Sequence, residues 1–287
     1  MNQKKEKRYS LTRETFTRLM KNRLAMFGLF ILCVLVITAI FADQIAPYSY
    51  DQMDLLNAYK APCKGHIFGT DEFGRDIFSR VVYGSRISLK VGFIAVSIAV
   101  VAGGLLGAVA GYYGGWTDNL IMRAMDVIMS IPATLLAISI AAALGAGLTN
   151  LMIATGIASI PTYARIVRAS VLGIKEQEFV EAARAVGTRD FTILCKHILP
   201  NCLAPIIVQA TLGVAFAILT AAGLSFIGLG IEPPTPEWGA MLSNARSYIR
   251  DYSYMCLFPG LAIALTIFSL NVLGDGLRDA LDPKLRQ

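Results

Sequence analysis

The sequence predicts an all-α integral membrane protein with six transmembrane helices. Of its 287 residues, 55% are hydrophobic and only 16% are charged, whereas a soluble domain carries about 25% charged residues. The charges are also unevenly placed, because five runs of 19 to 38 residues contain no Asp, Glu, Lys or Arg. A helix needs about 20 apolar residues to cross the hydrocarbon core of a bilayer. This composition excludes a disordered chain and a disulfide-rich scaffold, and it disfavours a cytosolic enzyme.

The first charge-free run, residues 24–42, predicts the first transmembrane helix. Its apolar stretch is longer than the core of about 7–15 residues found in a signal peptide, and no A-x-A cleavage site follows it. We therefore expect a retained anchor. Residues 11–23 are amphipathic and basic, which suits either a helix on the inner membrane surface or a solvated tail that sets the topology.

The other runs predict five further helices. The run of 38 residues between Asp126 and Arg165 is too long for one helix, and it divides at Gly145-Ala146-Gly147 into two helices joined by a tight hairpin. The predicted helices lie at residues 89–111, 122–144, 149–171, 203–228 and 254–274.

Small residues and prolines indicate how these helices pack. Gly103, Gly107 and Gly111 stand four residues apart, a spacing that lets two helix backbones approach closely. Pro132 and Pro161 are expected to bend the third and fourth helices. A role in packing is favoured over a role in gating.

The predicted helices carry few groups that could do chemistry. A proton-coupled carrier would place charged residues at membrane depth, but the interiors of the predicted helices contain none. Arg123 and Asp126 are expected to form an intrahelical pair, and Arg165 and Arg168 are expected to anchor a helix end. The sequence has no G-x-x-x-x-G-K-[ST] loop and no cluster of cysteines and histidines, so we expect no ATP, metal or other cofactor to be bound by this chain.

The distribution of Lys and Arg predicts the orientation. Positive residues near the ends of transmembrane helices collect on the cytoplasmic side, which predicts that both termini are cytoplasmic. The basic residues show no interleaved aromatic pattern, so no nucleic-acid partner is expected. The 18 of 26 Lys and Arg residues on the predicted inner side are Lys4, Lys5, Lys7, Arg8, Arg13, Arg18, Lys21, Arg23, Arg123, Arg165, Arg168, Lys175, Arg184, Arg189, Lys196, Arg278, Lys284 and Arg286.

The most informative segment lies between the fourth and fifth predicted helices. Residues 175–187 favour a helix until Gly187, which suits a helix C-terminus or a sharp turn. Asp190 is then expected to cap a second short helix. The residues alone leave two interpretations open, which are a docking element for another protein and a solvated connector.

Residues 181–201, EAARAVGTRDFTILCKHILPN, resemble the EAA loop in the permease subunits of bacterial ATP-binding-cassette (ABC) importers. His197 stands where that pattern usually has isoleucine. The resemblance implies a coupling helix seated on an ATPase subunit, in which Glu181 contacts the ATPase surface and Gly187 forms the turn. Ala182 and Ala183 would allow close seating. The positions that match the pattern are Glu181, Ala182, Ala183, Gly187, Leu199 and Pro200.

Three more stretches resemble the C-type permease of dipeptide, oligopeptide and nickel importers: residues 69–89, 233–239 and 274–285. The prolines and Trp238 of the second stretch suit a loop that lies against the membrane surface. The first stretch supplies charges that would orient a binding protein, brace a partner permease or hold the loop together by internal salt bridges. The residues of this extracytoplasmic motif are Gly69, Thr70, Asp71, Gly74, Arg75, Asp76, Arg80 and Arg86.

The resemblance implies the transmembrane domain of a type I ABC importer with an additional N-terminal helix. Residues 1–88 would form an N-terminal cytoplasmic segment, the first helix and an extracytoplasmic loop, and residues 89–287 the permease domain. The implied partners are a homologous permease in a heterodimer, two ATPase subunits and an extracytoplasmic solute-binding protein.

The implied function is ATP-driven import of di- and oligopeptides across the bacterial cytoplasmic membrane. The chain itself would be non-catalytic, with ATP and Mg²⁺ bound on the ATPase subunits. One alternative is a permease for nickel or a nickel chelate, because the same motifs occur in nickel importers. The other alternative is an autonomous carrier or channel.

Overall fold

The computed structural model describes residues 11–281, and these form helices joined by loops without a β-sheet. The all-α prediction is therefore confirmed for the described part of the chain. The basic residues predicted at positions 4–8 and 284–286, and the end of the stretch 274–285, lie outside the described residues.

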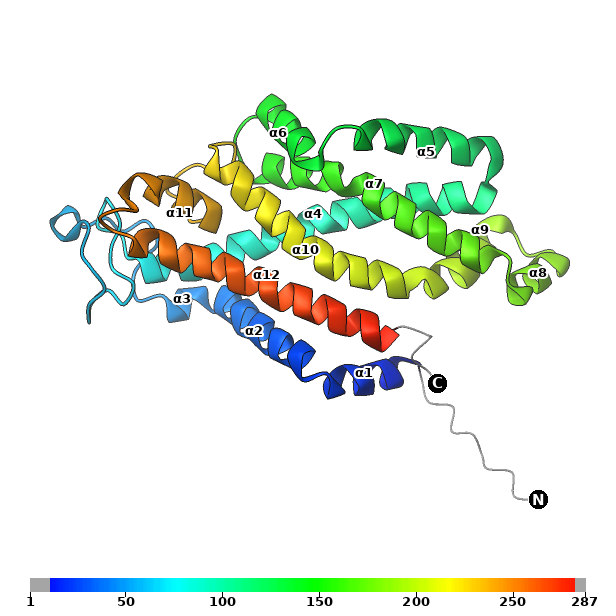
Figure 1. The fold of residues 1–287 in the computed structure, drawn as a ribbon, viewed down its shortest axis with the longest axis horizontal. Helices are drawn as coiled ribbons and strands as arrows, with labels where there is room; N and C mark the ends of the chain where they lie inside the picture. The colour runs from blue at the N-terminus through cyan, green and yellow to red at the C-terminus, as the bar shows by residue number, and fades with distance from the viewer. Residues whose placement is uncertain (1–10, 282–287) are drawn as a thin grey trace, which may run out of the picture.

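The helices form an elongated bundle, in which successive long elements run back and forth along its length (Figure 1). Each predicted span coincides with helical structure. The helices are α1 (Leu11–Lys21), α2 (Arg23–Ile40), α3 (Ala42–Ile45), α4 (Ile77–Tyr113), α5 (Gly115–Met129), α6 (Ala133–Leu144), α7 (Leu148–Lys175), α8 (Glu178–Ala185), α9 (Asp190–Thr192), α10 (Leu203–Phe226), α11 (Trp238–Ala245) and α12 (Tyr254–Leu281).

Four of these elements are long and apolar enough to cross a membrane, namely α2, α4, the segment Asp190–Phe226 that contains α10, and α12. A fifth is added if α5 and α6 count as one bent span. Helix α7 lies at the fourth predicted position but falls outside this set. Its small and polar residues face neighbouring helices, since Thr155 and Gly156 are buried.

The prediction of one continuous helix at residues 122–144 is wrong. Helix α5 ends at Met129, α6 begins at Ala133, and the two helices meet at an angle of 84°. Pro132 precedes α6 and adopts an extended ψ of 130°. Proline has no N–H to donate, and its ring disfavours a helical residue before it. Pro161, by contrast, lies inside α7, which continues unbroken.

A surface of glycines holds α4 against α7. A Cβ atom at Gly103 would lie 2.5 Å from the carbonyl oxygen of Ile160, and one at Gly107 would lie 2.2 Å from that of Ala164. These separations are far shorter than any real Cβ contact, so the two backbones touch where the glycines lie. The predicted close approach along this stripe is confirmed.

Two ion pairs connect α5 to α7. Arg168 donates to Asp118 from Nε at 2.5 Å and from Nη2 at 2.6 Å. Arg165 donates to Asp126 at 2.5 Å. The expected intrahelical pair of Arg123 and Asp126 is therefore wrong, because the carboxylate of Asp126 turns towards the neighbouring helix.

The bundle has two distinct ends (Figure 1). Helix α1, helix α8 and the C-terminal end of α12 lie at one end, and the loop of residues 46–76 and helix α11 lie at the other. Both ends of the described chain therefore lie on the same side as the loop between α7 and α10.

Candidate functional site

Helix α8 is fixed to the end of the bundle by Val180 and, to a lesser extent, by Ala183. Val180 is completely buried. It packs into a cluster with Ala108 and Tyr112 of α4 and with Val167 and Val171 of α7. Only two residues separate the end of α7 from the start of α8. A displacement of α8 would therefore also displace the ends of α4 and α7 that it contacts.

Gly187 ends α8 in a left-handed conformation, with a φ of +76°. Its N–H donates to the carbonyl of Arg184 at 2.9 Å, and the N–H of Thr188 donates to that of Ala183 at 3.1 Å. These two bonds form a Schellman motif, which satisfies the last carbonyls of the helix. Nothing lies within 4 Å of a Cβ placed at Gly187, so glycine is required there for its backbone conformation alone.

The outer surface of this loop is open and carries both charged and apolar side chains. Glu181 and Ala182 are exposed, and Ala183 is half-buried. Beside them Val186 is 81% exposed and Phe191 is 75% exposed. Large apolar side chains gathered at one exposed point are typical of a protein-binding surface.

The prediction that Asp190 caps a helix is wrong. The residue before α9 is Arg189, and no side chain bonds the start of that helix. Asp190 instead accepts a hydrogen bond from the hydroxyl of Tyr112 at 2.5 Å. The guanidinium of Arg184 lies 5.6 Å from the centre of the same Tyr112 ring. Sequence reasoning missed this connection because Tyr112 and Asp190 are 78 positions apart.

The end of the EAA-like segment leads into α10 through irregular turns. A wide π-helical stretch, Ile193–Ile198, is followed by a tight 3₁₀ turn that begins at Leu199. Leu199 packs against the cluster that holds Val180, whereas Pro200 is exposed. His197 is half-buried, and its carbonyl accepts a hydrogen bond from Asn201 at 2.6 Å. The structure thus brings both ends of the motif to one cluster.

A groove with several polar side chains in its largely apolar wall, which sequence reasoning also missed, lies between α7 and α10. A pocket of 360 Å³ contains Ser159, Thr162 and Gln209 in its lining, and a second pocket of 580 Å³ continues past Gln209 to Asn201 and Arg278. The side chains of Thr162 and Gln209 bond no other described residue, so both can bond a polar molecule in this α7–α10 groove. No spacing signal marks these residues, which come from separate helices.

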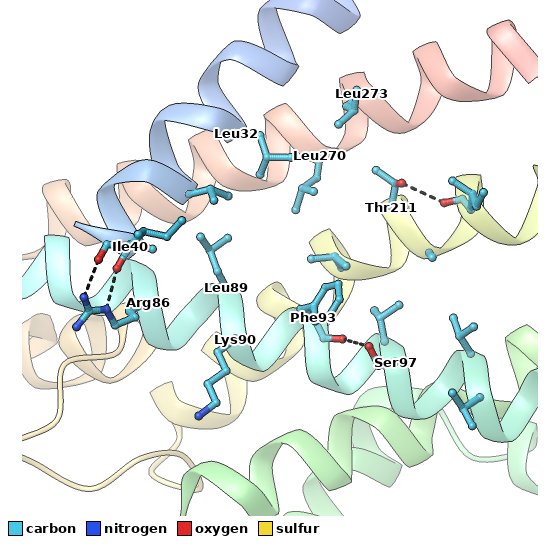
Figure 2. A pocket seen from close by; sticks show the side chains of 18 residues that line it. Leu32, Ile40, Arg86, Leu89, Lys90, Phe93, Ser97, Thr211, Leu270 and Leu273 are labelled. Atoms are coloured by element: carbon cyan, nitrogen blue, oxygen red, sulfur yellow. Dashed lines mark hydrogen bonds between the residues drawn. The ribbon is translucent and has the colours of Figure 1, made fainter. Parts of the chain in front are cut away.

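A larger pocket, by contrast, is apolar. It measures 860 Å³ and lies among α2, α4, α10 and α12 (Figure 2). Ser97 and Thr211 in its wall donate to backbone carbonyls of their own helices, at 2.8 and 3.0 Å. Arg86, at one end, donates to the carbonyls of Ala39 and Ile40. A polar solute would find few unoccupied partners here, so the α7–α10 groove is the better candidate for a polar substrate.

At the opposite end of the bundle, Asp71 organises the motif of residues 69–86. Its carboxylate accepts bonds from the backbone N–H groups of Phe73 and Arg75, both at 2.9 Å. The guanidinium of Arg75 donates to it at 2.6 Å, and that of Arg80 lies 3.7 Å away. Asp71, Arg75 and Arg80 are all buried. These charges therefore bond one another and present almost no surface to a partner.

Asp76 joins this loop to the start of α4. Its carboxylate accepts bonds from the N–H and the hydroxyl of Ser79, both at 2.7 Å, and so caps the helix. His66 lies 2.9 Å from its other oxygen. Thr70 is completely buried, and its hydroxyl donates to the carbonyl of Asn57 at 2.6 Å.

Two glycines and one arginine complete the motif. Gly69 and Gly74 have φ values of +79° and +72°. A Cβ at Gly74 would lie 1.8 Å from the carbonyl oxygen of Asp54. Arg80 donates to the carbonyls of Tyr50 and Pro234, at 2.8 and 3.2 Å. The motif is a folded unit that also holds the stretch 233–239 in place.

Trp238 does not lie against the membrane surface, which corrects the expectation for that stretch. Its side chain is completely buried, and its indole N–H donates to the carbonyl of Val81 at 3.0 Å. The neighbouring Glu237 is buried as well and caps α11 by accepting from the N–H groups of Gly239 and Ala240, at 2.9 and 2.8 Å. These bonds fasten α11 to α4.

Glu237 should make stability depend on pH. Burial raises the pKa of its carboxyl above the ordinary value of 4.5. The folded protein therefore favours the protonated carboxyl of Glu237. The contribution of this group to the free energy of unfolding is complete below pH 4.5 and is lost as the pH rises through the raised pKa. Replacing Glu237 with Gln should flatten the fall in Tm of the detergent-solubilised protein as the pH rises above 4.5. Equal slopes for the two proteins would contradict this expectation.

Comparison with known families identifies both parts of the chain. Residues 103–287 match the family described as "Binding-protein-dependent transport system inner membrane component". Residues 10–62 match the "N-terminal TM domain of oligopeptide transport permease C".

Individual relatives match along nearly the whole chain. The dipeptide transport system permease protein DppC of Alkalihalophilus pseudofirmus is 50% identical over 274 residues, which cover 96% of this chain and 90% of that protein. The glutathione transport system permease protein GsiD of Escherichia coli is 48% identical, with coverage of 95% and 90%. The same-named protein of Pectobacterium atrosepticum is 46% identical, with coverage of 96% and 91%.

One solved structure shares the fold. The inward-facing MetNI methionine ABC transporter matches with a TM-score of 0.57 and 18% sequence identity, over 71% of this chain and 96% of that chain. Together with the separate match of the N-terminal segment, this likeness confirms the predicted fold of an ABC importer transmembrane domain with an additional N-terminal helix.

Proposed function

Because the chain belongs to the family of binding-protein-dependent transport system inner membrane components, we propose that it is a permease subunit of an ATP-driven importer of di- and oligopeptides. Two relatives of nearly equal similarity are named for transport of a dipeptide and of glutathione, which is itself a tripeptide. The observation that carries the proposal is the exposed loop around α8, which is anchored on α4 and α7 through Val180.

The α8 loop is the docking element for the ATPase subunits. Glu181 contacts the ATPase, Ala182 and Ala183 permit close seating, and Gly187 sets the turn. The exposed Val186 supplies apolar contact area beside them. Closure of the ATPase pair on ATP and Mg²⁺ then moves the long helices, while this chain performs no catalysis and binds no cofactor.

The α7–α10 groove forms half of the translocation pathway. A peptide carries amides and terminal charges, which need hydrogen-bonding partners where water is excluded. Thr162 and Gln209 provide such groups near the middle of the bundle, and Arg278 provides a cation at the end that carries α8. A homologous permease closes the other half, which makes the complex a heterodimer.

The orientation follows from the same arrangement. Both termini and the α8 loop are cytoplasmic, and the loop of residues 46–76 faces outwards, towards a solute-binding protein. The buried charges around Asp71 give that loop its shape, and exposed apolar residues such as Leu56, which is 98% exposed, supply its contact area. Residues 1–88 and 89–287 form the N-terminal part and the permease domain, joined by the continuous helix α4.

The test is uptake by cells that lack this chain, supplied with labelled dialanine, trialanine, glutathione or nickel. Restoring the wild-type chain should restore peptide uptake. Glu181→Lys and Gly187→Pro should leave the protein inserted but abolish uptake, since Lys reverses the docking charge and proline cannot adopt a positive φ. Glu178→Lys, on the same helix and exposed like Glu181, is the control and should retain uptake.

Each other outcome points to a different function. Loss and recovery of nickel uptake alone would transfer the assignment to a nickel or nickel-chelate importer. Uptake by liposomes that contain only the purified chain would identify an autonomous carrier or channel. Full uptake in both loop variants would show that the α8 loop is not the docking element.

A further inference from the structure

Helix α5 is attached to the rest of the described chain mainly by charge. Its one buried residue is Met125, while Trp116 on its outer side is 76% exposed. The other apolar side chains of α5 are half-buried or exposed, so apolar packing holds it only in part. Two ion pairs, Asp118–Arg168 and Asp126–Arg165, connect it to α7. The first is bidentate, and a bidentate pair fixes orientation as well as distance.

Helix α7 in turn is in direct contact with the α8 loop. Val180 of α8 packs on α7 and α4, and Asp190 of the loop is hydrogen-bonded to Tyr112 of α4. The glycine surface leaves no space between α4 and α7. These contacts combine the α8 loop, α7 and the adjoining end of α4 into one body.

The other end of α5 is a break in the chain. Residues 130–132 separate α5 from α6 at 84°, and Pro132 has no N–H with which to continue the helical bonding. Helix α6 begins immediately afterwards, and its first residue, Ala133, lies in the wall of the α7–α10 groove. A rotation of α5 would therefore shift the start of α6, which forms part of the groove wall.

We propose that the two Arg–Asp pairs make α5 move with α7, so that displacement of the α8 loop turns α6 about residues 130–132 and changes the width of the α7–α10 groove. This inference rests on the proposed function, because it assigns a route from the docking loop to the pathway. Asp118, Asp126, Arg165 and Arg168 are then positioning residues that act through α6.

The experiment uses the complete complex, with its partner permease and ATPase subunits, in lipid nanodiscs. Spin labels are placed at the half-buried Ser97 on α4 and the exposed Ser139 on α6, after the five cysteines have been replaced. The distance between the labels is measured without nucleotide and with ATP and vanadate. Uptake of labelled dialanine per ATP hydrolysed is measured in parallel in proteoliposomes.

The wild-type complex should show a change of label distance upon addition of ATP and vanadate. Asp118→Arg and Arg168→Asp should each abolish that change and lower uptake per ATP about tenfold, a typical coupling for residues in direct contact. The double variant restores the ion pair with the two charges exchanged. It should recover both the change of label distance and the uptake per ATP. Asp43→Asn, which removes an exposed ion pair to Arg86 at the other end of the bundle, is the control and should change neither.

A normal distance change in the single variants, or no recovery in the double variant, would overturn the inference. If the Asp118 variants do not assemble, Asp126→Asn and Arg165→Gln provide the same test at the more exposed pair. The label distance requires only ATP and vanadate. If the wild-type complex takes up no dialanine, the proposed substrate is wrong, but the distance measurement still decides the inference.

Discussion

Replacing Gly107 with valine is expected to force α4 and α7 apart and to prevent stable assembly of the bundle. A Cβ at this position would lie 2.2 Å from the carbonyl oxygen of Ala164 and 3.0 Å from the backbone nitrogen of Arg168. These neighbours are backbone atoms inside a helix, so no side-chain rotation can relieve the overlap. Overpacking a core typically costs about 1–3 kcal/mol, and an overlap with rigid backbone belongs at or above the upper end of that range.

Gly104 provides the matched control, because it lies in the same helix and nothing lies within 4 Å of a Cβ placed there. The two variants are compared by thermal unfolding and by size-exclusion chromatography in detergent. Gly107→Val should aggregate or lose much of its thermal stability, and Gly104→Val should behave like the wild type. Equal stability of the two variants would show that α4 and α7 are not in backbone contact.

Replacing Asp71 with alanine is expected to unfold the loop of residues 46–76. The carboxylate is the principal acidic partner of the Arg75 guanidinium and also neutralises that of Arg80, and both arginines are buried. Removing one partner of a buried ion pair typically costs about 3–5 kcal/mol, because a charge is left unpaired away from water. The backbone N–H groups of Phe73 and Arg75 would lose their acceptor as well.

Limited trypsin digestion reports on this change at Arg75 and Arg80, because both are buried in the folded loop and become accessible once it unfolds. We expect cleavage after Arg75 and Arg80 in Asp71→Ala but not in the wild type. Asp51→Ala removes an exposed carboxylate from the same loop and should leave the digestion pattern unchanged. A resistant Asp71→Ala protein would mean that the backbone bonds alone maintain the loop.

The long helices could be predicted from sequence because each membrane crossing requires an uninterrupted apolar segment. The charge-free runs therefore indicate where α2, α4, α10 and α12 lie, with close bounds for α2 and α10. The outer end of α4 was not predicted, since its first turns lie beyond the apolar run. They are stabilised by the Asp76 cap and by Trp238 from a distant segment.

The break at Pro132 shows where hydropathy is insufficient. Residues 127–144 contain no charge, and hydropathy does not distinguish one straight helix from two shorter ones. The direction of the Asp126 side chain was also beyond local reasoning. Arg123 stands three positions away on the same helix, but the partner in the structure is Arg165 on α7.

For the candidate site, the sequence indicated which segment matters but not how it is held. Glu181 and Gly187 stand in a recognisable pattern, and the turn at Gly187 has the predicted form. The hydrogen bond from Tyr112 to Asp190 and the groove beside Gln209 depend on contacts between helices far apart in the chain. Such contacts are specified by tertiary packing and leave no periodic signal.

The length of α4 determines how far the outer loops stand from the lipid. At 1.5 Å per residue, the segment Ile77–Ser88 that precedes the apolar run extends about 18 Å along the helix axis. The Asp71 network and helix α11 surround this extension. In the orientation proposed above, a large soluble protein that diffuses towards the membrane can therefore touch protein without first displacing water from the phospholipid headgroups. The rate of its encounter with the transporter then depends on the shape of the protein surface formed by this loop and α11. That rate is largely independent of the lipid composition around the transporter.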